Sequence, residues 1–143
     1  MSGDGRAFFD TNVLLYMYGG DASKRIRARN LFQQCVRDGR LILSTQVLQE
    51  FYAAGSRKLK IAPAILKEMV LALMDLPTVT VTSAEIRAAL ANEEQFGISF
   101  WDALILAAAQ AGNASTVYSE DLNDGQRYGS VTVRNPFQLE VAQ

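Results

Sequence analysis

Apolar and polar positions along the chain follow two patterns, one typical of strands and one typical of helices. The segments at residues 6–9, 41–44 and 131–134 are continuously apolar or alternate with a period of two, which favours strands. The longer segments between the short runs repeat their apolar residues every three to four positions, as one face of a helix does. We expect strands at about residues 6–9, 41–44, 79–81, 116–119 and 131–134, and helices that begin near Asn12 and cover about 22–38, 45–58, 62–75, 83–97 and 100–111.

Strands that alternate with helices predict an α/β fold with a parallel sheet covered on both faces, because parallel neighbours need helical crossovers. The 143 residues contain no internal repeat and no Pro-rich or Ser-rich linker, so we expect one domain over residues 1–143. Within it, residues 1–5 are expected to form a flexible N-terminus and residues 138–143 a C-terminal tail.

Four carboxylates come from separate segments, yet the predicted topology carries all of them to one edge of the sheet. Asp10 directly follows the first strand, and Asp121 follows the strand at 116–119. Glu50 lies in the second turn of the helix that leaves the second strand, and Asp102 in the first turn of a helix that has to run antiparallel to the next strand. Since ligands of such folds gather beyond the carboxyl ends of the strands, this edge is the expected site.

Three of these four carboxylates also have a purely structural interpretation. Asp10 can cap the following helix, and Asp102 stands three residues after Ser99 in a capping-box spacing. Asp121 and the nearby Asp124 lie in SEDLNDG, a segment rich in turn formers. The fourth carboxylate, Glu50, stands at no capping position of its helix. For the others, the sequence leaves both interpretations open.

From the composition, we expect carboxylates to carry any catalytic chemistry. The chain has no histidine and one cysteine, Cys35, which excludes Ser-His-Asp and Cys-His catalysis, histidine metal sites, a cysteine zinc cluster and an internal disulfide. Clustered like charges repel one another unless a cation lies among them. Ligands that are all oxygen select hard ions such as Mg²⁺ or Mn²⁺, which activate water and stabilise the leaving oxygen of a phosphodiester.

Four further residues near the carboxylates are candidates for a supporting role. Thr11, Asn12 and Ser119 offer hydroxyl and amide groups that can position phosphate or water, although all three also suit capping positions. Asp124 is the fourth candidate, with its role as a turn former as the alternative.

The formal net charge is −1, but the charges are unevenly distributed along the chain. Residues 21–60 hold nine Lys or Arg and three acidic residues, whereas residues 61–143 hold four Lys or Arg and ten acidic residues. The basic segment fits a solvated helix face as well as a patch that attracts phosphate beside an acidic site. Its cations are Lys24, Arg25, Arg27, Arg29, Arg37, Arg40, Arg57, Lys58 and Lys60.

No segment has the pattern of a targeting or membrane-spanning sequence. The start, MSGDG, lacks the basic and apolar stretches of a signal peptide. Asp10 and Asp102 interrupt the two most apolar segments well short of the length that a membrane span needs. We therefore expect no membrane association and a cytoplasmic location.

The segments that carry the acidic residues resemble, in order and spacing, those of the PIN-domain family, and specifically the VapC-type toxins of bacterial toxin–antitoxin pairs. They are FFDTNVLLY, QVLQEFY, SFWDALILAAA and YSEDLNDGQ with VRNPF, and they extend from Arg6 to Phe137. The resemblance implies a three-layer α/β/α sandwich with a central parallel sheet of four to five strands. It also implies a metal-dependent endoribonuclease that acts on an RNA such as tRNA or another structured RNA, a cognate antitoxin that covers the active-site groove, and a homodimer.

By the same resemblance, the catalytic acidic residues correspond to Asp10, Glu50, Asp102 and Asp121, and the expected ligands of Mg²⁺ or Mn²⁺ are Asp10, Asp102 and Asp121. Many relatives carry Thr where this chain has Ser119, a conservative change because either hydroxyl can serve. The position of Asp124 varies in importance across the family.

Two other functions compete with a nuclease toxin. A non-catalytic PIN-like module that binds RNA or a partner protein has the same fold but no need of a divalent site. A phosphatase with Asp10 as covalent nucleophile, in the manner of haloacid-dehalogenase enzymes, also begins with an apolar strand and an Asp. Such enzymes normally carry a second Asp two residues on, where this chain has Asn12.

Overall fold

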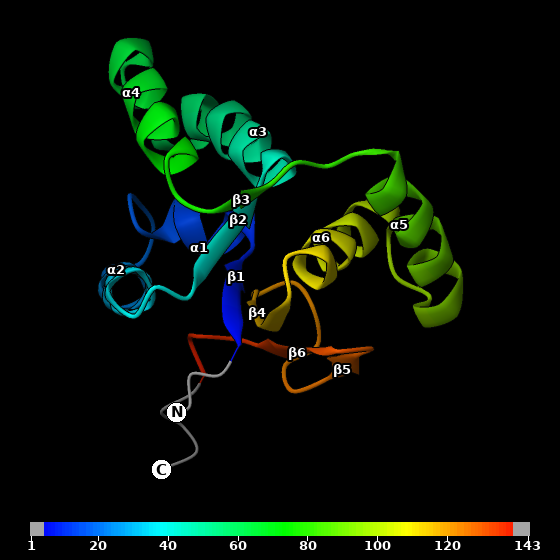
Figure 1. The fold of residues 1–143 in the computed structure, drawn as a ribbon. Coiled ribbons are helices and arrows are strands. Elements are labelled where there is room, and N and C mark those ends of the chain that lie inside the picture. The colour runs from blue at the N-terminus through cyan, green and yellow to red at the C-terminus, as the bar shows by residue number, and fades with distance from the viewer. Residues whose placement is uncertain (1–4, 139–143) are drawn as a thin grey trace.

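The computed structural model describes residues 5–138 and shows a central sheet with the strand order β3-β2-β1-β4-β6-β5 (Figure 1). The pairs β3–β2, β2–β1, β1–β4 and β4–β6 are parallel, and β5 pairs with β6 antiparallel at one edge. This arrangement confirms the predicted α/β class with a central parallel sheet and adds one antiparallel edge strand. The strands are β1 (Arg6–Phe9), β2 (Leu41–Ser44), β3 (Thr78–Val79), β4 (Ala114–Tyr118), β5 (Arg127–Tyr128) and β6 (Val131–Arg134).

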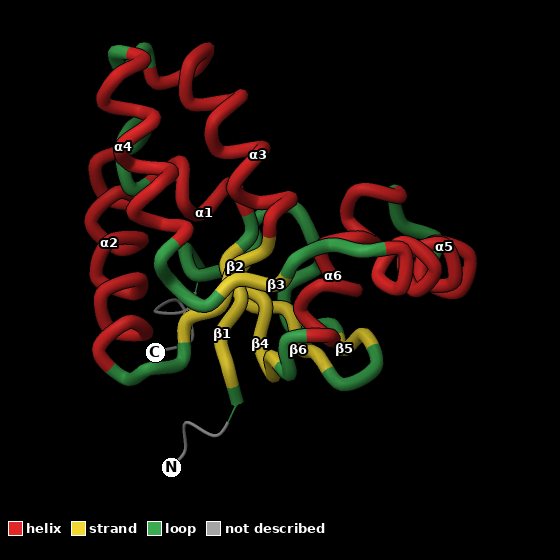
Figure 2. The backbone as a smooth tube through the Cα atoms, turned by 45° about the horizontal axis from the view of Figure 1, so that its top comes forward, coloured by secondary structure: helices red, strands yellow, loops and turns green. Residues whose placement is uncertain are grey.

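Helices cover both faces of the sheet, as the three-layer expectation requires. The first four helices lie on one side of the sheet, and α6, with α5 packed against it, lies on the other (Figures 1 and 2). The helices are α1 (Thr11–Tyr16), α2 (Ala22–Arg37), α3 (Thr45–Ala54), α4 (Pro63–Met74), α5 (Ser83–Phe96) and α6 (Phe100–Ala111), and a π-helical turn, η1 (Gly55–Leu59), continues α3.

Local capping residues set where the helices begin. The Ser44 side chain accepts a hydrogen bond from the Val47 amide at 3.3 Å and thereby starts α3 at the carboxyl end of β2. Thr82 and Glu85 form the capping box expected at the start of α5. Pro63 occupies the first turn of α4, where its missing amide hydrogen costs no helical hydrogen bond. The Ser44 cap thereby fixes the start of α3, the helix that carries Glu50, at the carboxyl edge of the sheet.

Three element boundaries differ from the sequence prediction. The expected strand at 79–81 is shorter and shifted, because the Val81 amide donates to the Thr45 side chain at 3.0 Å instead of to a neighbouring strand. The expected helix at 45–58 is α-helical only to Ala54 and then widens into η1. The strand expected at 116–119 begins at residue 114 and ends before Ser119, whose side chain turns to the sheet edge instead.

The first and fourth strands lie side by side at the centre of the sheet, where the strand order reverses. From β1 the chain builds outward through β2 and β3, and it then returns to the other side of β1 with β4. The Asp10 amide donates to the Tyr118 carbonyl at 2.9 Å, so the carboxyl ends of these two strands are held together. Ligands of parallel α/β folds bind at this kind of position, which places the candidate site.

The core of the protein packs on the two strands that lead to this edge. Phe8, Phe9 and Val117 are fully buried in the central strands, with Val47 and Phe51 of α3 against them. Such close packing gives the residues that follow the strands fixed positions. Among residues 5–138, no helix has both the length and the apolarity to cross a membrane. The predicted N-terminus and C-terminal tail lie outside the described residues, apart from Gly5 and Gln138.

Candidate functional site

All four carboxylates singled out by the sequence line one pocket at the carboxyl edge of the sheet. Asp10 comes from the end of β1, Glu50 from α3, Asp102 from α6 and Asp121 from the loop after β4. The pocket has a volume of about 300 Å³. The structure therefore places side chains from four distant segments where the predicted topology puts them. The other residues that line the pocket are Thr11, Asn12, Leu15, Gln46, Ala53, Ala54, Arg57, Lys58, Trp101 and Ile105.

Asp10 is the deepest of the four carboxylates, with only 5% of the residue exposed. One carboxylate oxygen accepts a hydrogen bond from the Thr11 amide at 2.7 Å and thereby caps α1. The other accepts from the Ser119 hydroxyl at 2.8 Å and from the Asn12 amide group at 3.3 Å. Asp10 is thus both the helix cap of its structural interpretation and a wall of the pocket.

Burial raises the pKa of Asp10 from 3.8 to about 7. The hydrogen bonds from Ser119 and Thr11 oppose this rise, and the negative charges of Asp121 and Glu50 add to it. A buried carboxyl group that faces other carboxylates holds its proton more tightly, because each negative charge disfavours the next. A perturbed pKa of this size in a cleft is typical of functional sites.

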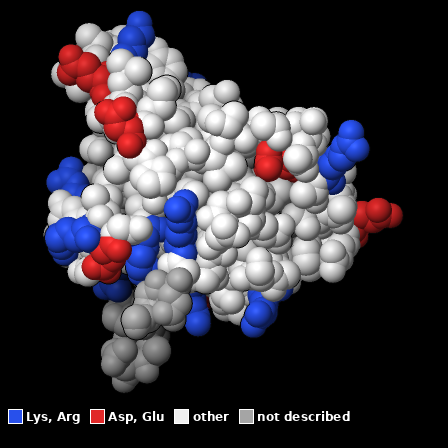
Figure 3. Space-filling model, viewed as in Figure 1, with Lys and Arg blue, Asp and Glu red and all other residues white. Residues whose placement is uncertain are grey.

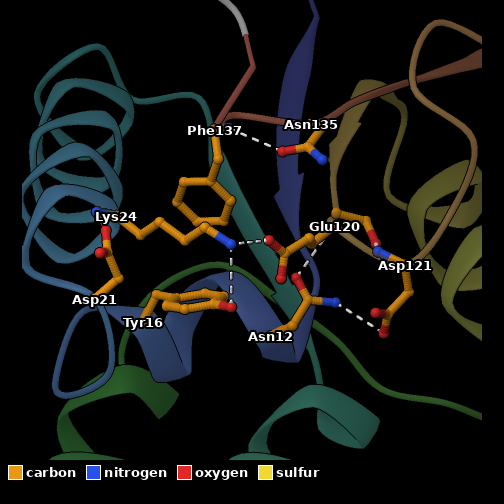
Figure 4. A network of polar contacts seen from close by, with 9 residues as sticks. Asn12, Tyr16, Asp21, Lys24, Glu120, Asp121, Asn135 and Phe137 are labelled. Carbon is orange, nitrogen blue, oxygen red and sulfur yellow. Dashed lines mark hydrogen bonds and ion pairs between the residues drawn. The ribbon is translucent and has the colours of Figure 1, made fainter.

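Asn12 joins Asp10 to the loop that follows β4. Its side-chain amide group donates to Asp121 at 3.0 Å, and its carbonyl oxygen accepts from the Glu120 amide at 3.1 Å (Figure 4). The Asp121 amide in turn donates to the Ser119 hydroxyl at 3.1 Å. These contacts fix the loop that carries Asp121 against the start of α1.

The Glu50 carboxylate is held from both sides. The Thr11 hydroxyl donates to one oxygen at 2.6 Å, and the Gln46 side-chain amide donates to the other at 3.1 Å. Gln46 also donates to the backbone carbonyl of Trp101 at 3.3 Å, so α3 and the start of α6 are connected through this one side chain. Two anchoring contacts restrict Glu50 to one orientation over the pocket.

Asp102 faces the same pocket from the opposite helix. Its amide donates to the side chain of Ser99 at 3.1 Å, so Ser99 caps α6 as its spacing predicts. The pKa of Asp102 is raised by burial and further by the negative charges of Asp121 and Glu50, and the hydrogen bond to Ser99 works against this rise. Asp102 therefore lies within electrostatic reach of Asp121 and Glu50.

Two of the candidate supporting residues do not line the pocket. Ser119 is fully buried beneath it and acts on the pocket through Asp10 and the Asp121 amide. Asp124 is not brought to the site, because its carboxylate accepts a hydrogen bond from the Asn135 amide at 2.8 Å and ties the loop after β4 to the end of β6.

Among the described residues, both cations that line the pocket come from η1, and the rest of the basic segment does not reach it. Arg57 and Lys58 line the same pocket as Trp101, and both are exposed. Within residues 5–138, neither side chain makes a hydrogen bond or an ion pair. The Lys and Arg side chains of α2 gather on another part of the surface, visible in Figure 3. Lys24, for example, pairs with Glu120 and lies over the rings of Tyr16 and Phe137 (Figure 4).

Sequence reasoning missed Gln46 and Trp101 as members of the site. Gln46 precedes Glu50 by four residues and therefore lies on the same face of α3, which was the available signal. Trp101 directly precedes Asp102, but adjacency on a helix gives no information about what faces the pocket.

The side chains of the pocket fit a hard divalent cation in type but are not assembled into a ligand cluster. Their donors are carboxylate, hydroxyl and amide oxygens, the set that Mg²⁺ and Mn²⁺ prefer. Throughout the described part of the chain, however, no three acidic or cysteine side chains converge closely enough to hold an ion. Two of the carboxylates are nevertheless close together, because the side-chain amide group of Asn12 donates a hydrogen bond to both Asp10 and Asp121.

Comparisons with known proteins agree with this fold and with the resemblance found in the sequence. A toxin–antitoxin complex from Klebsiella pneumoniae matches with a TM-score of 0.70 and 18% identity, over 91% of this chain and 97% of the other. The sarcin–ricin loop cleaving toxin VapC20 of Mycobacterium tuberculosis matches with a TM-score of 0.64 and 22% identity, over 80% and 89%. VapBC2 of Rickettsia felis, bound to a DNA fragment from its promoter, matches with a TM-score of 0.65 and 18% identity, over 90% of this chain and 97% of the other.

These identities are low, so the solved structures establish the fold only. No match was found among curated protein sequences. The model of the PIN domain family matches residues 7–126, which include Asp10, Glu50, Asp102 and Asp121. The predicted family is thereby confirmed: this chain belongs to the PIN domain family.

Proposed function

We propose that this protein is a metal-dependent endoribonuclease that hydrolyses RNA phosphodiester bonds, and that it is the toxin of a toxin–antitoxin pair acting in the cytoplasm. The observation that carries the proposal is that four carboxylates, from four segments of the chain, line one pocket at the sheet's switch point. The acidic pocket makes hydrolysis at a phosphate the best-supported reaction, because such a pocket concentrates cations that in turn attract phosphate.

Asp10, Asp102 and Asp121 are the residues that would hold Mg²⁺ or Mn²⁺. When bound, the ion supplies a Lewis acid that activates water and stabilises negative charge on the phosphoryl oxygens. The buried position of Asp10 and its contacts with Ser119 and Asn12 hold its carboxylate in one orientation at the pocket. Asp121 and Asp102 face it from the loop after β4 and from α6.

Glu50 is assigned to proton transfer from the attacking water. Its two oxygens are held by Thr11 and Gln46, so the carboxylate keeps its orientation while the substrate enters. Arg57 and Lys58 would bind phosphates on either side of the scissile bond, since both are exposed cations on the wall of the pocket. This assignment narrows the role of the basic segment 21–60 to its last few residues.

The fold neighbours support the toxin role and an antitoxin partner. The structures from Klebsiella pneumoniae and Rickettsia felis are complexes of toxin and antitoxin, and the Mycobacterium tuberculosis protein is a toxin that cleaves the sarcin–ricin loop. By analogy, we propose a structured RNA as substrate, a cognate antitoxin as inhibitor and a homodimer as the assembly.

The proposal is tested by incubating the antitoxin-free protein with a pool of structured RNAs, with Mn²⁺, with Mg²⁺ and with chelator. The Asp10→Asn variant, purified in the same way, is the control for a contaminating nuclease. Cleavage that requires the metal and is lost in the variant is the expected result. Cleavage that persists with chelator, or that is equal in Asp10→Asn, would contradict it.

A non-catalytic PIN-like module that binds RNA or protein is the alternative. The observation that favours it is the absence, among residues 5–138, of three acidic or cysteine side chains arranged around one ion position. Calorimetric titration with Mn²⁺ separates the two functions. The nuclease has to bind the ion and lose that binding in Asp10→Asn, whereas a module without catalysis gives no difference between the two proteins.

A further inference from the structure

Trp101 stands at the rim of the acidic pocket and is unusually exposed for so large an apolar side chain. It lines the pocket together with the carboxylates, and 62% of the residue is accessible to solvent. It is also the only tryptophan of the chain. Tryptophan is rarely left so exposed in a folded protein without a use, because burying its ring is strongly favourable.

The position of Trp101 is fixed on two sides. Its ring packs edge to face against the ring of Phe100, with centroids 5.2 Å apart and an angle of 76° between the planes. Its backbone carbonyl accepts a hydrogen bond from Gln46, the residue that also orients Glu50. The backbone that carries the indole is therefore tied to the helix of Glu50, and the ring itself is supported on one side by Phe100.

Another part of the pocket lining carries positive charge. Arg57 and Lys58 lie on η1, where the α-helix widens into a π-helical turn before ending at Lys60 in the left-handed conformation. Widened turns of this kind occur frequently at functional sites. The pocket therefore combines an acidic floor, a cationic wall and an aromatic rim.

This combination matches the three chemical parts of a nucleotide. The cations suit the phosphate, the carboxylates suit the reaction centre, and an exposed indole face suits an unstacked base. We propose that Trp101 is the stacking platform for an unpaired base next to the scissile phosphate, and that it makes the site selective for single-stranded segments of RNA. The inference rests on the proposed function for the identity of the scissile phosphate, but the stacking itself is a binding property.

Selectivity for unpaired bases follows from the geometry of stacking. A base in a duplex has both faces covered by its neighbours, so it cannot lie on Trp101 without being unstacked first. A base in a loop or a single strand has a free face. Stacking on an aromatic ring tolerates different bases, so Trp101 is expected to select for single-strandedness more than for sequence.

The single tryptophan makes the test direct, because the intrinsic fluorescence of the protein at long excitation wavelength comes from Trp101 alone. The full-length protein in chelator, where no metal-dependent cleavage occurs, is titrated with a short oligoadenylate and with the same strand annealed into a duplex. We expect strong quenching of the fluorescence by the single strand and little by the duplex. Binding measured by a band shift without any change in fluorescence would overturn the proposal, as would failure of the oligoadenylate to bind.

Variants distinguish the loss of stacking on Trp101 from the loss of any exposed apolar side chain. Trp101→Ala is expected to weaken oligoadenylate binding roughly 10- to 100-fold, and Trp101→Phe to restore part of it, because phenylalanine keeps a smaller stacking face. Ile26→Ala is the matched control, since Ile26 is 60% exposed on α2 and does not line the pocket. Circular dichroism of each variant checks its folding. Equal affinity of Trp101→Ala and the unchanged protein would overturn the proposal.

The outcomes distinguish this inference from the proposed function. Quenching by single-stranded RNA without any cleavage under metal would leave the stacking platform in place and contradict the nuclease. Metal-dependent cleavage without quenching, with Trp101→Ala as active as the unchanged protein, would support the nuclease and overturn the platform. If Trp101→Ala binds RNA normally but sediments as a smaller species, the indole belongs to a protein interface and the proposal is wrong. In the nuclease, the same substitution is expected to raise KM for a loop substrate more than it lowers kcat.

Discussion

Asp10 shows at the scale of one residue how a structural role and a functional role coincide. One oxygen of its carboxylate caps α1 through the Thr11 amide, and the other faces Ser119, Asn12 and the pocket. Capping alone needs only a polar acceptor, and it does not require a buried carboxylate among other carboxylates. The raised pKa of Asp10, to about 7, shows that this arrangement disfavours the ionised form of the group in the metal-free protein.

A first prediction follows for the stability of the metal-free protein. The pKa of Asp10 is about 7 in the folded chain and near 3.8 when the chain is unfolded, so the folded state binds the proton more tightly between these values. The free energy of unfolding should therefore fall as the pH rises from about 4 to 7. Above pH 7, ionisation of Asp10 should lower it no further. Asp10→Asn removes the charge and keeps an oxygen for the cap. The variant should be more stable by about 1–3 kcal/mol at pH 8, and its advantage should disappear toward pH 4.

Urea denaturation of both proteins in chelator, at pH 8 and near pH 4, measures this difference. Asp75→Asn is the control, because Asp75 is an exposed residue at the end of α4 and lies away from the pocket. A variant at position 10 that is less stable than the unchanged protein at pH 8 would mean that the carboxylate is stabilised by its hydrogen bonds more than it is penalised by burial.

Contacts between distant side chains were beyond prediction at the residue scale. The spacing of Ser99 and Asp102 predicted the cap of α6, because capping is local. The link from Gln46 to the Trp101 carbonyl joins residues 55 positions apart, and no local rule contains it. Asp124 had the residue type expected near the site, but its turn directs it to the Asn135 amide.

The π-helical turn η1 is the element that brings positive charge to an acidic pocket. The apolar period of the sequence predicted a helix over residues 45–58, and it could not show that the helix widens after Ala54, since one extra residue in a turn leaves the pattern nearly unchanged. The widened turn presents Arg57 and Lys58 to the pocket. Other cations of the basic segment are engaged away from the pocket: Arg29 donates to the Met17 carbonyl at 2.6 Å, and Arg40 donates to the Gly5 carbonyl at 3.0 Å.

A second prediction concerns this turn. The double variant Arg57→Ala and Lys58→Ala should bind RNA about 10-fold or more weakly at physiological salt, because each cation that no longer meets a phosphate removes part of the electrostatic binding energy. The slope of the logarithm of the binding constant against the logarithm of the salt concentration should become shallower by one to two units, roughly one for each phosphate that is no longer neutralised. Filter binding of a loop-containing RNA over a series of salt concentrations gives both numbers.

Lys67→Ala is the matched control for this experiment, since Lys67 is an exposed cation on α4 that does not line the pocket. An unchanged salt slope in the double variant would assign the RNA-binding role to another surface, and the cations on α2 would then be the next candidates (Figure 3).

At the scale of the whole molecule, the order of the strands creates the site. The strand and helix pattern predicted a parallel sheet, and the rule for parallel sheets predicted the edge at which the acidic residues meet. The sequence could not show which strands are neighbours. The structure places β1 beside β4, so that residues 10 and 119 touch although the chain between them builds half of the sheet. The antiparallel edge strand β5 was also missed, because its two residues are too few to form a pattern.

A third prediction concerns the effect of metal on global stability. An ion that binds the folded protein and not the unfolded chain raises the midpoint of thermal unfolding as its concentration increases. Mn²⁺ at about 100 times its dissociation constant should stabilise the protein by about 2.7 kcal/mol. It should stabilise Asp102→Asn much less. Thermal scans with increasing Mn²⁺ measure this effect, with Ca²⁺ as the comparison ion. Equal stabilisation of both proteins would place the ion outside the pocket.

The central claim is that the four carboxylates act together in one hydrolytic site, and the rate of metal-dependent RNA cleavage tests it most directly. The single variants Asp10→Asn, Glu50→Gln, Asp102→Asn and Asp121→Asn are compared with Asp75→Asn in Mn²⁺, on one RNA that the unchanged protein cleaves. Removing a group that only orients a metal ligand typically costs 10- to 100-fold, so removal of any of the four carboxylates should lower the rate by at least about 100-fold. Asp75→Asn should cleave at the unchanged rate. Full activity in Asp10→Asn and Asp102→Asn would contradict the account, because the pocket would then be a feature of the fold and not the site of reaction.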